Sequence, residues 1–153
     1  MATKSGIPDA ELRFLYLSPA SRYALLGMRA LAAAGGRGGF QLVSEAARRG
    51  GLPANMLAKT FQRLARHRLL VSQRGPGGGY ALTRPAREIH LAEILLAVQD
   101  IVPGGHHCLL RNRLCKEGGF CLIHRLITKA DRVLIDGLRK LTLEDLVQSG
   151  GWS

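Results

Sequence analysis

The residues of this chain best suited to chemistry are three cysteines and one histidine gathered in a single short segment. The run CLLRNRLCKEGGFCLIH has the spacing C-x6-C-x5-C-x2-H and contains Cys108, Cys115, Cys121 and His124. Thiolates bind soft metals, and three of them on a glycine-containing loop can converge on one site. Cys121 and His124 stand three residues apart where a helix is expected to begin, so their side chains share a face. Nearby basic residues would stabilise thiolates and offset the charge of a cluster: Arg111, Arg113, Lys116 and Arg125.

Several chemistries fit this loop. An iron–sulfur cluster takes soft ligands of this kind. A structural zinc ion usually requires four tetrahedral ligands and a C-x2–4-C knuckle, which the segment lacks. Two of the three thiols could instead form a switchable disulfide, or all three could stay reduced and unbound, whereas an odd number of cysteines argues against a disulfide framework. The spacing alone does not choose between these chemistries.

Positive charge is concentrated in the N-terminal half of the chain. The segment from Leu12 to Arg87 holds 13 Lys or Arg residues and one acidic residue, Glu45, whereas the other residues include 9 basic and 10 acidic ones. The formal net charge of +11 is therefore +12 from this segment and −1 from the remainder. A one-sided positive field neutralises phosphates and releases their counterions, so it predicts a nucleic-acid-binding surface. The alternative is a basic face that is merely solvated.

The same half of the chain predicts three helices. Ser18-Pro19 is a typical helix start, and Gly35-Gly36 is a typical end. A short helix is expected over roughly 42–49 and a third over roughly 53–67, with Gly50-Gly51 between them. Two short helices joined by a glycine-containing turn are typical of a helix-turn-helix, whose second helix enters the major groove of DNA. The exposed face of that second helix should carry Asn55, Lys59, Gln62, Arg63 and Arg66.

A glycine-rich hairpin follows these helices. Residues 69–74 and 80–83 are typical of strands, and Gly75–Gly79 is typical of a turn, which gives the element order of a winged helix. The GK[ST] ending of a nucleotide-binding P-loop is absent, and an ordinary hairpin turn is the simplest alternative. We favour a wing whose bare backbone at Gly77 and Gly78 approaches DNA, with Arg74 placed to enter a narrow minor groove.

The C-terminal part is expected to be helical. A short helix over about 91–98 precedes the cysteine loop, and a long amphipathic helix follows Cys121. Such a helix outside a small winged-helix core is expected to pair with its copy in a twofold dimer, and packing on one end of the core is the alternative. Thr142 and Asp145 form a capping-box pattern that begins a last short helix. The apolar stripe of the long helix consists of Leu122, Ile123, Leu126, Ile127, Ala130, Val133, Leu134, Leu138 and Leu141.

In this order the segments resemble a known family. SRYAL at 21–25, the helix-turn-helix, RGPGGGYAL at 74–82, the three-cysteine loop and the long helix are similar to the Rrf-two-type winged-helix transcriptional regulators, in particular the iron–sulfur-dependent, IscR-like branch. The resemblance covers about residues 17–147. It implies a homodimeric transcription factor, usually a repressor, that binds double-stranded operator DNA. It also implies control by an iron–sulfur cluster, with 2Fe–2S favoured and 4Fe–4S possible.

The resemblance assigns ligands and also marks departures from the family pattern. Six residues separate the first two cysteines where IscR-like members have five, which leaves the cluster type open. Arg22 stands where the nitric-oxide-sensing branch has an acidic ligand, and Ala58 stands where the IscR-like branch has an acidic base-reading residue. A different operator sequence is therefore expected. The implied ligands are the three cluster cysteines Cys108, Cys115 and Cys121, completed by His124.

The sequence thus predicts a mainly α protein with a β-hairpin wing. It divides into a leader (1–16), a winged helix-turn-helix DNA-binding domain (17–100), a cluster-binding loop (101–121), and a dimerisation helix with a short C-terminal helix (122–153). The chain shows no nucleophile–base pair or catalytic carboxylate pair, so neither an enzyme nor a small-molecule substrate is expected. Apolar runs of membrane length and a signal peptide are also absent, so we expect a cytoplasmic protein with no membrane partner. Two alternatives stay open: a cluster-free thiol redox-sensing regulator, and a basic structural nucleic-acid-binding protein with zinc or no metal.

Overall fold

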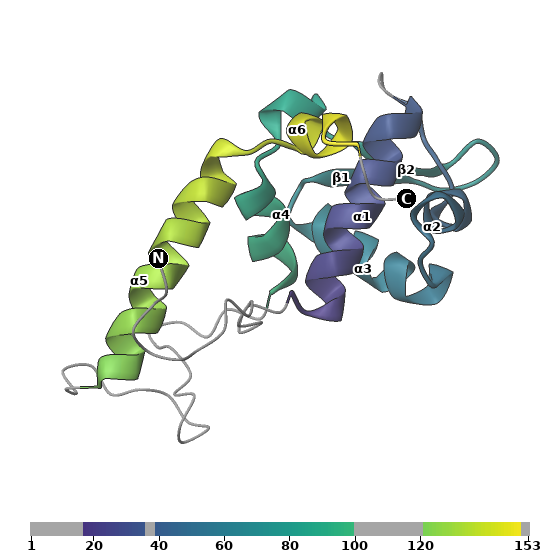
Figure 1. The fold of residues 1–153 in the computed structure, drawn as a ribbon. Helices are drawn as coiled ribbons and strands as arrows, with labels where there is room; N and C mark the ends of the chain where they lie inside the picture. The colour runs from purple at the N-terminus through teal and green to yellow at the C-terminus, as the bar shows by residue number, and fades with distance from the viewer. Residues whose placement is uncertain (1–16, 36–38, 100–120, 151–153) are drawn as a thin grey trace.

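The computed structural model of the chain describes residues 17–35, 39–99 and 121–150. In this part the chain is mainly helical, with one two-stranded antiparallel sheet (Figure 1). The predicted fold class is therefore confirmed, and the leader and most of the cysteine loop lie outside the described residues. The elements in chain order are α1 (Pro19–Gly35), α2 (Val43–Gly50), α3 (Ala54–Arg66), β1 (Leu70–Gln73), β2 (Gly79–Leu82), the 3-10 helix η1 (Ala86–Glu88), α4 (Leu91–Val98), α5 (Leu122–Lys140) and α6 (Leu143–Gln148).

Helix α1 lies at the centre of the core and contacts α2, α3, α4 and α6. It begins as predicted, because the Ser18 hydroxyl accepts a hydrogen bond of 3.1 Å from the backbone N–H of Ser21. Gly27 allows α3 to cross α1 closely: a Cβ at this position would lie 2.5 Å from Leu57 Cδ1 and 2.7 Å from Phe61 Cε1. The core is therefore built where the small face of α1 meets the large side chains of α3.

Helices α2 and α3 form the predicted helix-turn-helix. Helix α2 ends at Gly51, whose φ of +62° is the left-handed conformation that closes a helix at low cost with glycine. Pro53 then precedes the first turn of α3, where its missing N–H costs nothing. Leu57, Phe61 and Leu64 are fully buried on one side of α3. The opposite side of α3 is left facing solvent.

The hairpin pairs Leu70 with Leu82 at one end and Gln73 with Gly79 at the other. A third segment joins it, because Gln41 and Tyr80 exchange backbone hydrogen bonds of 2.9 and 2.8 Å. This isolated bridge ties β2 to the chain just before α2. The wing and the helix-turn-helix are thereby held together by backbone contacts as well as by the core.

Helix α5 stands at the edge of the molecule beside α4 (Figure 1). None of its residues is buried, so the described core does not absorb it. Helix α6, in contrast, returns to the winged helix, where it contacts α1 and η1 and buries Leu143 completely. The predicted capping box is present at its start: Thr142 Oγ1 accepts from the N–H of Asp145, and the Asp145 carboxylate accepts from the N–H of Thr142. The division of the chain into domains stays a prediction.

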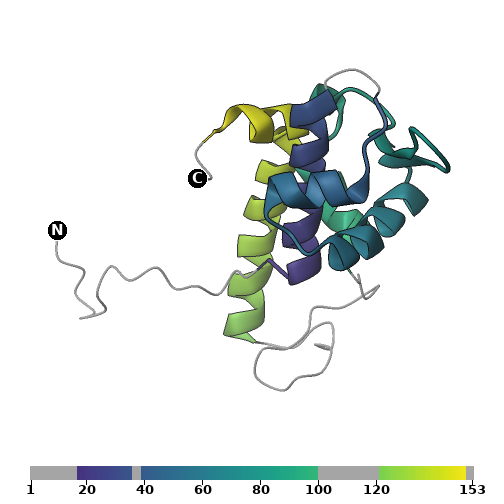
Figure 2. The ribbon, with the colours of Figure 1, turned by 90° about the vertical axis from the view of Figure 1, so that its right-hand side faces the viewer.

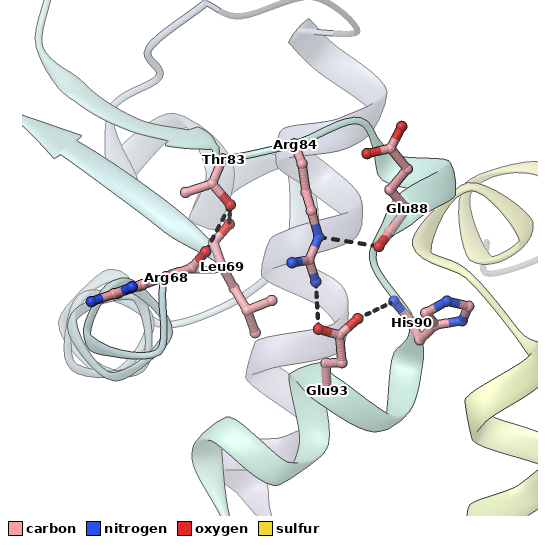
Figure 3. Close-up of polar contacts among 7 residues, drawn as sticks. All are labelled: Arg68, Leu69, Thr83, Arg84, Glu88, His90 and Glu93. Carbon is pink, nitrogen blue, oxygen red and sulfur yellow. Dashed lines mark hydrogen bonds and ion pairs between the residues drawn. The ribbon is translucent and has the colours of Figure 1, made fainter.

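The segment after the wing is fixed to α4 by one carboxylate (Figure 3). Arg84 forms an ion pair with Glu93 and also donates from Nε to the backbone oxygen of Glu88 at 3.1 Å. The second oxygen of Glu93 accepts from the N–H of His90 at 3.0 Å, which caps α4. Burial acts to raise the pKa of Glu93, but the His90 hydrogen bond and the Arg84 guanidinium outweigh it and hold the pKa below its ordinary value.

Candidate nucleic-acid interface and cysteine segment

The exposed side of α3 carries the residues predicted to read DNA. Asn55, Lys59 and Gln62 are exposed, and Arg63 is half-buried. The Asn55 side chain also accepts a hydrogen bond of 2.8 Å from the N–H of Met56 in the first turn of the helix. Figure 2 shows α3 and the hairpin close together on the right-hand side of the molecule. The predicted major-groove and wing residues therefore come from neighbouring elements.

The tip of the wing is a turn that glycine makes possible. Gly78 N–H donates to Gly75 O at 3.0 Å, and the φ of Gly77 is +71°, so Pro76 and Gly77 occupy the central positions of a type II turn. A Cβ at Gly78 would lie 2.3 Å from the backbone oxygen of Gln73. The fold thus requires glycine at 77 and 78 whether or not DNA is bound. Gly77 is exposed, whereas Gly78 is buried beneath the turn.

Arg74 lies next to this turn and is exposed, as a minor-groove residue must be. Other basic residues lie in the last turns of α2 and α3: Arg48, Arg49, Arg63 and Arg66. Basic side chains at the C-terminal end of a helix also stabilise it, because they lie near the negative end of the helix dipole. From 46 to 87 the sequence contains no carboxylate, so no acidic side chain of this segment interrupts the positive field.

Sequence reasoning missed Gln41, which positions the wing. Its side chain donates to Leu31 O at 3.2 Å and accepts from Arg49 Nη1 at 2.9 Å, while its backbone pairs with Tyr80. One residue therefore connects the end of α1, the end of α2 and strand β2. A single polar residue in a loop gives no periodic signal, so only the tertiary contacts identify its role.

Two of the four predicted metal ligands lie in the described part of the chain. Cys121 is the N-cap of α5, and its sulfur accepts a hydrogen bond of 3.5 Å from the N–H of His124. As their spacing predicted, the two residues lie together at the start of the helix, and both are half-buried. Cys108 and Cys115 lie outside the described residues. Within the described ranges, no three metal-binding side chains are grouped together.

Helix α5 presents the predicted apolar stripe to solvent. The exposed fraction is 76% for Leu122, 65% for Leu126 and 69% for Val133, which is high for large apolar side chains on a long helix. None of the described helices is long and apolar enough to cross a membrane. Among the described residues, most of the stripe is therefore an exposed apolar face, whereas Leu138 near its C-terminal end packs against the core.

A winged helix-turn-helix with a basic recognition helix and a basic wing defines a class of DNA-binding regulators. The sequence matches the Rrf2 family, described as iron-dependent transcriptional regulators, over residues 17–149. The chain belongs to this family. As predicted, it is a transcriptional regulator and not an enzyme.

Individual relatives agree with this assignment. The HTH-type transcriptional regulator IscR of Sodalis glossinidius (strain morsitans) is 33% identical over 133 residues, which is 87% of this chain and 79% of that protein. The structure of T. potens IscR has a TM-score of 0.71 at 24% identity and covers 89% of this chain and 88% of its own. The oxidized form of Staphylococcus aureus CymR has a TM-score of 0.66 at 25% identity, covering 87% and 96%. These likenesses confirm the Rrf2 winged-helix fold.

Proposed function

We propose that this regulator is a cytoplasmic homodimer, a repressor whose binding to operator DNA is controlled by an iron–sulfur cluster. Its proposed ligands are Cys108, Cys115, Cys121 and His124. The observation that carries the proposal is the pairing of Cys121 and His124 in the first turn of α5. A sulfur and an imidazole from one helical turn, next to a loop with two more cysteines, are a donor set suited to iron.

The described donors fit a cluster in chemistry and in position. Thiolate and imidazole are both ligands of iron–sulfur centres. Cys121 lies at the N-terminus of α5, where the positive end of the helix dipole favours a negatively charged ligand. When bound, the cluster would join its ligands to one another. Its presence would depend on the supply of iron and on whether the cluster is oxidised.

Along the chain, the proposed ligands follow α4 and lead into α5, the two elements that we expect to move relative to each other. Helix α4 leads into the cysteine segment and packs against both α1 and the recognition helix α3. Helix α5 begins at the last cysteine and presents the apolar stripe through which we expect two copies to pair. A change in how Cys121 and His124 are held would therefore change the position of α5 relative to α3. In a dimer this alters whether two α3 helices fit successive major grooves.

DNA contacts are proposed on two elements. On α3, Asn55, Lys59, Gln62 and Arg63 would enter the major groove, where side chains distinguish bases. At the wing, Arg74 would enter the minor groove, and the exposed backbone at Gly77 would pass close to it, while Gly78, buried beneath the turn, would hold the turn in shape. The exposure of Lys59 and Arg74 and the absence of carboxylates from 46 to 87 support this assignment.

The test is an absorption spectrum of the full chain purified without oxygen, together with iron and sulfide analysis. Brown protein with matching iron and sulfide is expected. The same protein, titrated with promoter DNA before and after removal of the cluster, should change its affinity. Tightly bound zinc with no iron and no visible absorption after reconstitution would overturn the proposal.

A second candidate is a cluster-free regulator that senses oxidants through its thiols. The similarity to Staphylococcus aureus CymR, which has been solved in an oxidized form, favours it. In that case the protein should bind no iron. Peroxide should then lower the number of titratable thiols from three, and dithiothreitol should restore both the thiols and the original DNA affinity.

A further inference from the structure

Arg68 adopts a backbone conformation that is unusual for its side chain. Among the described residues other than glycine, it alone has a positive φ, of +59°. It follows the last residues of α3, and two hydrogen bonds close the helix around it: Arg68 N–H to Ala65 O and Leu69 N–H to Leu64 O, both 3.0 Å. This pair of bonds is the Schellman motif, in which the residue at the position of Arg68 is most often glycine.

The fold gains nothing visible from arginine at this position. A side chain in the left-handed region crowds its own backbone, whereas glycine adopts the region freely. The Arg68 carbonyl accepts a hydrogen bond of 2.7 Å from Thr83 Oγ1, but any residue supplies that carbonyl. The guanidinium forms no hydrogen bond or ion pair with the part of the chain that the structure describes. Local stability therefore does not account for arginine here.

The position of Arg68 suggests a reason outside the single chain. It lies exposed at the junction between α3, which ends at Arg66, and β1, which begins at Leu70. In Figure 3 its side chain extends away from the Arg84–Glu93 pair. The junction joins the element assigned to the major groove to the element assigned to the minor groove. These two grooves are separated by a sugar–phosphate strand, so a cation at the junction is placed for a phosphate rather than a base edge.

We propose that Arg68 is a phosphate-contacting residue and that its left-handed backbone is retained for this contact despite the cost to stability. The inference rests on the proposed DNA binding through α3 and the wing, and adds a contact at their junction. The proposal predicts that a single substitution at Arg68 both stabilises the protein and weakens its binding to DNA.

The test compares Arg68→Gly and Arg68→Lys with the unaltered full chain. Glycine should raise the melting temperature by about 2–4 °C, because it relieves the left-handed strain. On a mixed-sequence duplex that spans two major grooves, its affinity should fall roughly threefold to tenfold, and the slope of log K against log salt should lose about 0.9 for each bound chain, the share of one phosphate per chain. Lysine keeps the charge and the strain, so it should retain the melting temperature and most of the affinity.

Two further variants separate the possible failures. Arg87→Ala removes an equal charge from η1, which contacts α6, and should leave DNA affinity nearly unchanged. Lys59→Ala tests the recognition helix itself. If Arg68→Gly keeps full affinity while Lys59→Ala loses it, the Arg68 proposal fails and the proposed function stands. If neither variant loses affinity, the DNA-binding assignment fails. The Arg68 proposal is also overturned if Arg87→Ala weakens binding equally or if Arg68→Gly melts no higher than the unaltered chain.

Discussion

The backbone of Gly79 passes so close to that of Gln41 that no side chain fits between them. A Cβ at Gly79 would lie 2.1 Å from the carbonyl oxygen of Gln41, and the φ of Gly79 is +132°. This approach occurs where the one-residue bridge ties β2 to the segment before α2. The third glycine of the GGG run is thus required by the packing of the wing on the helix-turn-helix.

Gly79→Ala should therefore destabilise the protein by about 2–4 kcal/mol, through steric overlap and an unfavourable φ. Urea unfolding followed by circular dichroism measures the change. Gly39→Ala is the matched control, because a Cβ there meets no atom within 4 Å. Equal effects of the two substitutions would show that the close approach is not what constrains position 79.

The Arg84–Glu93 pair should make stability depend on pH. The pKa of Glu93 lies below its ordinary value of 4.5, so its contribution to stability is present above that pH and is lost as the pH falls through the lowered pKa. Glu93→Gln should accordingly be less stable than the unaltered chain at neutral pH, and the difference should shrink under acid conditions. Glu88→Gln, which removes only an exposed 3.7 Å pair with Arg87, should change stability little. If the loss of stability in Glu93→Gln stays the same down to acid pH, the pair does not act in this way.

Base-reading and phosphate contacts should respond differently to mutation. Lys59→Ala should cost roughly 1–3 kcal/mol on a preferred promoter duplex and blur sequence preference. Arg74→Ala should weaken binding to preferred and scrambled duplexes alike and lower the salt dependence by about one phosphate for each bound chain. Titrations of both duplexes at several salt concentrations distinguish the two, with Arg139→Ala on α5 as the control. If Lys59→Ala and Arg74→Ala bind like the control, the winged helix is not the DNA-binding surface.

His124 should be the fourth ligand of the cluster. Cys115→Ala should abolish iron and sulfide binding, whereas His124→Ala should leave a cluster that is labile or spectroscopically altered. The decay of visible absorption in air measures this, and Lys129→Ala, an exposed residue on the next turn of α5, is a suitable control. An unchanged spectrum and lifetime in His124→Ala would show that the fourth ligand is another residue, with His106, His107, Asp9 and Glu11 as the remaining candidates.

The exposed stripe of α5 should be buried against a second copy of the chain. Leu126 and Val133 are 65% and 69% exposed in the single chain, and two such helices would remove this apolar surface from water. Replacing both by aspartate should yield a monomer or insoluble protein in sedimentation experiments. Replacing Lys129 and Arg132 on the same helix by glutamine is the control, because it lowers the net charge by the same amount. A wild-type chain that sediments as a monomer at micromolar concentration would refute the dimer.

Local sequence determined the elements of this protein. Apolar spacing, Ser18-Pro19, the Gly50-Gly51 break and the Thr142–Asp145 box placed the described helix boundaries within a residue or two, because caps and glycines act on their immediate neighbours. The same holds for the hairpin and for the shared first turn of Cys121 and His124. The segregation of charge and the order of the motifs were also sufficient to indicate the Rrf2 family.

Only the tertiary structure decided how these elements are joined. The bridge from Gln41 to Tyr80, the return of Leu143 to the core and the contact of Arg84 with Glu93 connect residues whose spacing follows no helical or strand period. The left-handed backbone of Arg68 could not be predicted from the sequence either, since a pattern of apolar residues does not show which residue closes a helix. Such features arise from how packed elements meet, which periodicity along one element does not encode.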